Sequence, residues 1–120
     1  MDNVIFQFKR GRTYSRYFTI TEYTDKVDKM LFTVCENEED KNYKIRKTLD
    51  DGITIIDEGT DEKGVYYRTY NLFIKATDTD KLKIGKEYVF DITLYTGSIK
   101  LPVINGIMIL EGTSTKTCNE

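Results

Sequence analysis

Short runs in which apolar and polar residues alternate are the feature that most constrains the fold of this chain. In Glu87–Tyr95 the residues Tyr88, Phe90, Ile92 and Leu94 are apolar, and Glu87, Asp91 and Thr93 alternate with them. A period of two residues is typical of a β-strand with one buried face. We therefore predict that Phe90 and Ile92 are buried near the centre of the core.

A second alternating run, Tyr66–Lys75, precedes this one, and the segment between them is rich in turn residues. We expect the two runs to pair as a hairpin at the centre of the core. Asp50-Asp51-Gly52 is a further hairpin signal, and the acidic stretch Asp57–Gly64 is expected to form a loop. Gly11 is the expected positive-φ residue of an early turn.

Similar runs recur along the chain with turn signals between them, and no helix-length amphipathic pattern interrupts them. This pattern predicts an all-β sandwich or barrel of about 8–9 short antiparallel strands. The predicted strands are Val4–Lys9, Thr13–Ile20, Met30–Glu36, Tyr43–Leu49, Ile53–Ile56, Tyr66–Lys75, Glu87–Tyr95, Ile99–Val103 and Gly106–Glu111. A chain of 120 residues fits one domain, which we place at 1–112, followed by a polar tail at 113–120.

The composition excludes several classes of function. The sequence contains no histidine, the commonest general acid–base and metal ligand. The net charge is only −2, with both signs interspersed, so a nucleic-acid partner is not expected. No apolar run reaches the length of a membrane helix, and the N-terminus lacks a signal-peptide pattern, so we expect neither membrane insertion nor secretion by that route. Cys35 and Cys118 are expected to stay reduced.

Two clusters of acidic residues could hold a cation or supply catalytic carboxylates. The first contains Asp57, Glu58, Asp61 and Glu62, and the second contains Asp78 and Asp80. Neither cluster has the spacing of an EF-hand loop, and no feature of either spacing indicates a glycosidase pair. We therefore expect solvated loops here, with no metal, no cofactor, no catalytic residue and no enzymatic activity.

The nine tyrosines and six phenylalanines are more rings than one small core requires. Either a second apolar face is covered by a partner sheet or by loops, or exposed rings contact another protein. The run Gly106–Glu111 is apolar on both faces, which is unusual for a free sheet edge. The residues that we predict to contact a partner, together with one or both chain ends, are Tyr14, Tyr17, Tyr67, Met108 and Leu110.

Three motifs follow one another in a distinctive order. Phe8–Thr13 reads FKRGRT, Ala76–Leu82 reads ATDTDKL, and Gly85–Ile92 reads GKEYVFDI. Gly106 then opens the last apolar run. The order and spacing resemble those of small structural proteins of tailed bacteriophages, a family that includes the N-terminal module of upper baseplate proteins.

The similarity extends from about Val4 to Gly112. The sequence departs from the family pattern at Arg12, where the family often has Asp, and at Phe90, where the family often has Tyr. The resemblance implies an immunoglobulin-like β-sandwich that is made in the host cytoplasm and is part of the virion, on the baseplate, tail or capsid. It implies other virion structural proteins as partners, and either a homo-oligomer or a symmetric assembly. An alternative is a host-surface or carbohydrate-binding module, in which exposed tyrosine rings stack on sugars.

Overall fold

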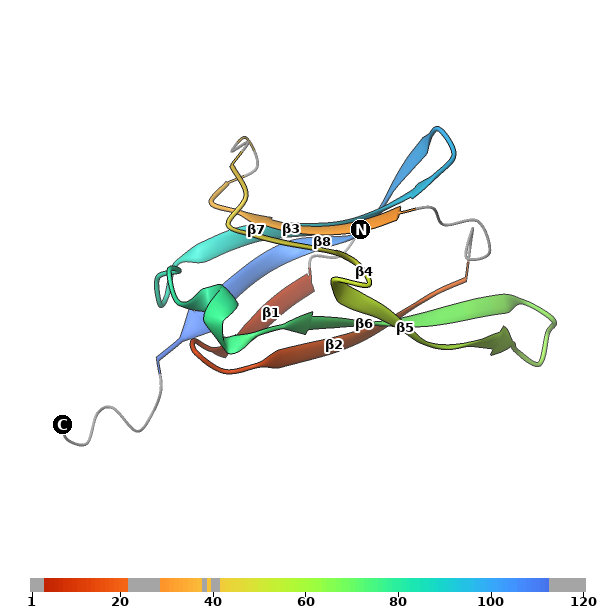
Figure 1. Ribbon diagram of the computed structural model, residues 1–120, viewed down its shortest axis with the longest axis horizontal. Coiled ribbons are helices and arrows are strands. Elements are labelled where there is room, and N and C mark those ends of the chain that lie inside the picture. Colours follow the sequence, from red (N-terminus) through yellow and green to blue (C-terminus); the bar gives the residue numbers. More distant parts are fainter. Residues whose placement is uncertain (1–3, 22–28, 38, 40–41, 113–120) are drawn as a thin grey trace.

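A computed structural model describes residues 4–21, 29–37, 39 and 42–112 (Figure 1). The described chain is all-β, as predicted. Its eight strands are β1 (Val4–Lys9), β2 (Tyr14–Ile20), β3 (Lys29–Cys35), β4 (Ile45–Leu49), β5 (Gly52–Thr60), β6 (Tyr66–Ile74), β7 (Glu87–Thr96) and β8 (Ile99–Glu111). A short 3₁₀ helix, η2 (Ala76–Thr79), lies between β6 and β7.

All eight strands belong to one sheet in the order β1-β8-β7-β3-β4-β5-β6-β2. The sheet turns over where β4 meets β5, so that β5, β6 and β2 lie opposite β8, β7 and β3 (Figure 1). The result is nearly a barrel. The prediction of purely antiparallel strands is wrong, because β1 pairs with β8 in the parallel sense from Val4–Gly106 to Lys9–Glu111.

The prediction that Tyr66–Lys75 and Glu87–Tyr95 pair as a central hairpin is also wrong. β6 pairs with β2 and β5, whereas β7 pairs with β3 and β8. The two runs therefore lie in opposite layers and bury their apolar faces in the same core. The turn-rich segment between them includes η2, which carries the chain from one layer to the other.

The chain turns a corner at Asp50–Gly52 rather than forming the predicted hairpin. Asp50 and Gly52 both have positive φ, and Thr48 and Asp51 exchange backbone hydrogen bonds. β5 pairs with β4 over only two residues, in the parallel sense, and pairs with β6 from Ile53 to Thr60, with an irregularity between Ile55 and Asp57. Consequently the acidic residues up to Thr60, which were expected to form a loop, belong to a strand.

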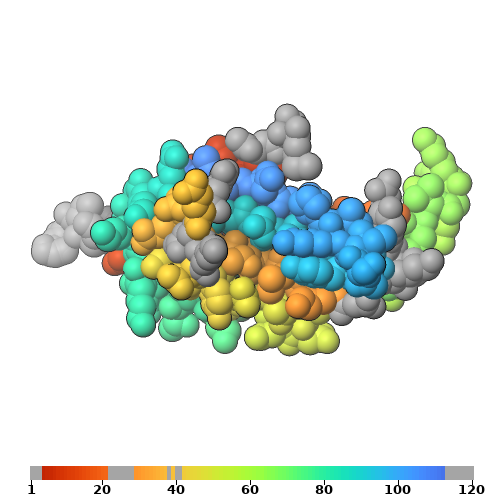
Figure 2. Space-filling view, turned by 90° about the horizontal axis from the view of Figure 1, so that it is seen from above, coloured from red at the N-terminus to blue at the C-terminus, as the bar shows by residue number. Residues whose placement is uncertain are grey.

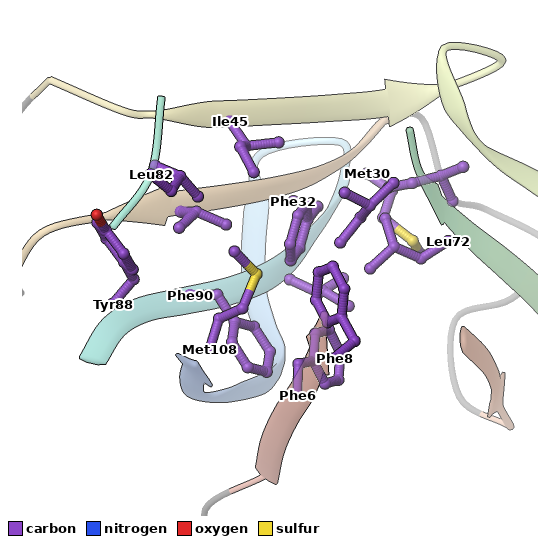
Figure 3. Packing of buried hydrophobic residues seen from close by; sticks show 14 of the residues in the cluster. Phe6, Phe8, Met30, Phe32, Ile45, Leu72, Leu82, Tyr88, Phe90 and Met108 are labelled. Carbon is purple, nitrogen blue, oxygen red and sulfur yellow. The ribbon is translucent and has the colours of Figure 1, made fainter. Parts of the chain in front are cut away.

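The core contains residues from both layers. Phe90 and Ile92 are buried, as predicted. The Phe90 ring stacks on Phe6 with 4.1 Å between centroids, and Phe32 and Met108 lie close by (Figure 3).

The two last predicted strands are one continuous strand, β8, with an irregularity in its pairing near Pro102. The chain bends there without leaving the sheet. β8 ends at Glu111, within the predicted domain 1–112, and the predicted tail lies outside the described residues. The end of the domain therefore stays a prediction.

Candidate contact surfaces

The structure separates the five residues that were predicted to contact a partner. Tyr17 is 67% exposed on the outer side of β2. Tyr67 is half-buried on the outer side of β6. Tyr14 points the other way, because it shares the inward parity of Phe18, and its ring stacks on Phe8 at 4.3 Å.

Met108 and Leu110 are fully buried in the core of this chain. The expectation that they face a neighbour rested on β8 being a sheet edge. β8 instead lies between β1 and β7 and is paired along both edges, and Met108 and Leu110 are on its inward face. A contact surface on this fold therefore does not include them.

Tyr17 and Tyr67 lie on one surface, together with Phe73. Tyr17 pairs with Asn71 across β2 and β6, and Asn71 shares its outward parity with Tyr67 and Phe73. Phe73 is 39% exposed. Tyr67 lies over Gly59, where an added Cβ would meet its ring and hydroxyl at 3.2–3.6 Å. We call the surface formed by Tyr17, Tyr67 and Phe73 the ring face.

The acidic end of β5 is occupied by hydrogen bonds to β6. Glu58 accepts hydrogen bonds from Tyr66 and Arg68. The hydroxyl of Tyr66, followed by the charge of Arg68, holds the pKa of Glu58 below its usual value, although desolvation opposes this. Burial alone would lower the pKa of Arg68, but the hydroxyl of Tyr66 raises it overall, so the guanidinium stays charged.

Two further acidic side chains, Asp57 and Asp61, also accept hydrogen bonds within the chain. Asp57 accepts a hydrogen bond from the Tyr67 hydroxyl, and the negative charge of Asp57 raises the pKa of that hydroxyl. Asp61 accepts the backbone N–H groups of Lys63 and Val65 in the turn that follows β5. Within residues 4–21, 29–37, 39 and 42–112, no three carboxylates or cysteines gather in a way that could hold a metal ion.

A groove of about 840 Å³ lies on the opposite side of the molecule, on the outer face of β3, β7 and β8. Figure 2 views this face, with β3 in orange and β8 in blue. Its lining includes Tyr43 and Tyr95, the charged residues Arg46 and Asp91, and Asn105. We call it the sheet groove.

Sequence reasoning did not identify the sheet groove. The alternation in β7 does place Asp91 and Thr93 on the outward side. Thr33, Arg46 and Asn105 come from β3, β4 and β8, and only the strand register brings them beside Asp91.

Two further expectations concern the whole chain. Cys35 is half-buried on β3, and Cys118 lies outside the described residues, so their reduced state stays a prediction. Among the described residues, no helix is long and apolar enough to span a membrane.

Comparisons with protein-family models, with curated proteins and with solved structures give no match for this chain. Its surfaces are therefore the basis for a functional proposal.

Proposed function

We propose that this chain is a non-enzymatic structural protein of a tailed-bacteriophage virion and that it acts through protein–protein contacts. The order and spacing of the FKRGRT, ATDTDKL and GKEYVFDI motifs support this proposal. The all-β fold is compatible with it. Its partners would be other virion proteins and further copies of itself, in a symmetric assembly.

The finer description that we propose for the fold is an immunoglobulin-like sandwich. β4 and β5 share only two paired residues. Without that link, the sheet divides into a layer of β1, β8, β7, β3 and β4 and a layer of β5, β6 and β2. Two such layers around one core correspond to the sandwich architecture.

The observation that carries the functional proposal is the ring face. It presents Tyr17, Tyr67 and Phe73 on a three-stranded surface, and aromatic residues are enriched in protein interfaces. A ring that is fixed on a strand loses little conformational entropy when it is buried by a partner. β2 is also an edge of the sheet, so a partner strand could pair with its backbone beside the rings.

Photo-cross-linking in purified particles of the phage that encodes the chain tests this proposal. The variant Tyr17→benzoylphenylalanine is expected to form an adduct with another virion protein or with a second copy of the chain. Tyr43→benzoylphenylalanine, which lies on the opposite face, is the matched control and is expected to form no such adduct. Absence of the chain from the particles would overturn the proposed role, and adducts at Tyr43 alone would overturn the assignment of the ring face.

A further inference from the structure

A row of polar side chains crosses the floor of the sheet groove. Asn105 pairs with Asp91 across β8 and β7, Asp91 pairs with Thr33 on β3, and Thr33 pairs with Arg46 on β4. An amide, a carboxylate, a hydroxyl and a guanidinium therefore follow one another over four strands, and all four residues line the groove. Such a row offers hydrogen-bond donors and acceptors alternately to one extended ligand.

The charged groups of the groove are not neutralised by one another. Among the described residues, Arg46, Asp91 and Lys100 take part in no ion pair, whereas Glu58 and Asp78 elsewhere each pair with a cation. The Asp91 carboxylate accepts a hydrogen bond from the Thr93 hydroxyl at 3.3 Å. The hydrogen-bond donors and acceptors of these groups are therefore open to a ligand in the groove.

Two tyrosine rings frame the polar row. Tyr43, in the segment before β4, is 49% exposed, and the guanidinium carbon of Arg46 lies 4.0 Å from the centre of its ring. Tyr95, near the end of β7, is covered by the ammonium group of Lys29 at 5.0 Å. In each case the cation lies against one face of the tyrosine ring and fixes the orientation of the ring. A ligand would stack on the opposite face.

We propose that the sheet groove binds an oligosaccharide. Sugar rings combine hydroxyl groups with apolar C–H faces, which match the polar row and the tyrosine rings respectively. Asp91 would accept hydrogen bonds from sugar hydroxyls, while Asn105 and Arg46 would donate them. Tyr43 and Tyr95 would stack on sugar rings. The volume of about 840 Å³ lies within the range of ligand-binding clefts.

The chemistry of the sheet groove distinguishes it from the ring face. A protein contact is centred on buried apolar and aromatic residues, with charged residues depleted from its core. The sheet groove instead contains the polar row with Asp91, Asn105 and Thr33, which suits a hydroxylated ligand. Because Arg46 and Lys100 outnumber Asp91, uronic-acid chains are expected to bind more tightly than neutral chains at low salt.

An array of immobilised neutral and uronic-acid-containing oligosaccharides, probed with the full chain, tests the proposal. The wild type is expected to bind at least one chain, and titration of that chain then gives the affinity. Tyr43→Ala and Asn105→Ala are each expected to weaken binding by about tenfold, from the loss of a stacking ring or of hydrogen bonds. Both side chains are exposed, so both variants are expected to stay folded, which circular dichroism checks.

Tyr17→Ala, on the ring face, is the matched control and is expected to bind the oligosaccharide as the wild type does. Absence of binding to every oligosaccharide on the array would overturn the proposal. So would binding that is unchanged in both groove variants, or binding that Tyr17→Ala abolishes. Since the readout is saccharide binding rather than incorporation into particles, its outcome is independent of the proposed virion role.

Discussion

At the residue scale, Lys47 is a charged side chain that is almost completely enclosed. Only 8% of it is exposed, and its Nζ lies 2.7 Å from Oδ2 of Asp78. The same carboxylate accepts the backbone N–H of Lys75 at the start of η2, also at 2.7 Å. The pair thus connects β4 to the crossover between the two layers. An added Cβ at Gly52 would meet the Lys47 stem at 2.4 Å, so the corner at Asp50–Gly52 also holds this lysine in place.

We expect Asp78→Ala to lower the free energy of unfolding by about 2–3 kcal/mol. The change leaves the ammonium of Lys47 enclosed without a counter-charge. The cost stays below that of a fully buried pair because water still reaches Asp78. Urea unfolding measures it. Asp80→Ala, an exposed neighbour, is the control and should change the stability by less than about 0.5 kcal/mol; equal effects of the two variants would contradict the role of the pair.

Glu58 gives a pH-dependent prediction. Its pKa in the folded chain lies below the ordinary value of 4.5, first because Tyr66 donates a hydrogen bond to it and then because Arg68 is close. A pKa that is lower when folded means that the stabilisation is fully present above about pH 4.5 and is lost as the pH falls through the folded pKa.

Tyr66→Phe is therefore expected to raise the pKa of Glu58 towards 4.5 and to destabilise the chain more at pH 6 than at pH 3. A carbon-detected NMR titration of the Glu58 carboxyl measures the first effect, and thermal unfolding at the two pH values measures the second. Tyr67→Phe removes a hydroxyl that contacts Asp57 instead, so it should leave the Glu58 pKa unchanged. A Glu58 pKa that is the same in wild type and Tyr66→Phe would refute the assigned cause.

At the scale of the elements, β1 approaches β8 unusually closely at Gly106. An added Cβ there would lie 1.8 Å from the carbonyl oxygen of Val4, so no larger residue fits without a shift of the backbone. The sequence places Gly106 at the start of an apolar run, and the structure gives the physical reason for a glycine at that position.

Gly106→Ala is expected to push β1 away from β8 and to cost about 1–3 kcal/mol, as overpacking does elsewhere. Chemical denaturation gives the change in stability, and amide exchange of β1 shows where it acts. Gly112→Ala is the matched control, because the nearest atom to its added Cβ is Ile84 Cδ1 at 3.9 Å. If the two alanine variants are equally stable, the close approach does not require glycine.

Periodicity predicted which residues of a strand face the core, but not which strand lies beside it. β7 shows this: Phe90 and Ile92 are buried as the alternation indicates, whereas the predicted partner, Tyr66–Lys75, lies in the opposite layer. The two-residue period shows which face of a strand is buried. Which strands pair with one another depends on the packing of the whole core.

The acidic end of β5 was missed for a related reason. Asp, Glu and Gly are poor strand formers, yet Glu58 lies in a strand because Tyr66 and Arg68 on the neighbouring strand bind its carboxylate. The sheet groove was likewise only half visible in the sequence. Asp91 has outward parity, but Asn105, Thr33 and Arg46 become its neighbours only through the register.

At the scale of the whole molecule, the near-barrel has one seam. β1 and β2 are the two ends of the strand order, so among the described residues no backbone ladder joins them. Side chains bridge the seam instead. Tyr14 on β2 lies against Phe6 and Phe8 on β1, with ring centroids 5.4 and 4.3 Å apart, and the guanidinium of Arg16 lies 5.2 Å from the Phe6 ring.

Because no ladder closes the seam, we expect Tyr14→Ala to loosen β1 and β2 before it loosens the rest of the sheet. Loss of two ring contacts should raise the amide hydrogen exchange of these two strands by about tenfold or more, with smaller changes in β3 and β7, which are paired on both sides. Tyr17→Ala, on the same strand but pointing outward, is the control and should leave the exchange pattern unchanged in the isolated chain. Exchange that rises equally in all strands of Tyr14→Ala would mean that the seam opens only with global unfolding, and that its rings belong to the same cooperative unit as the core.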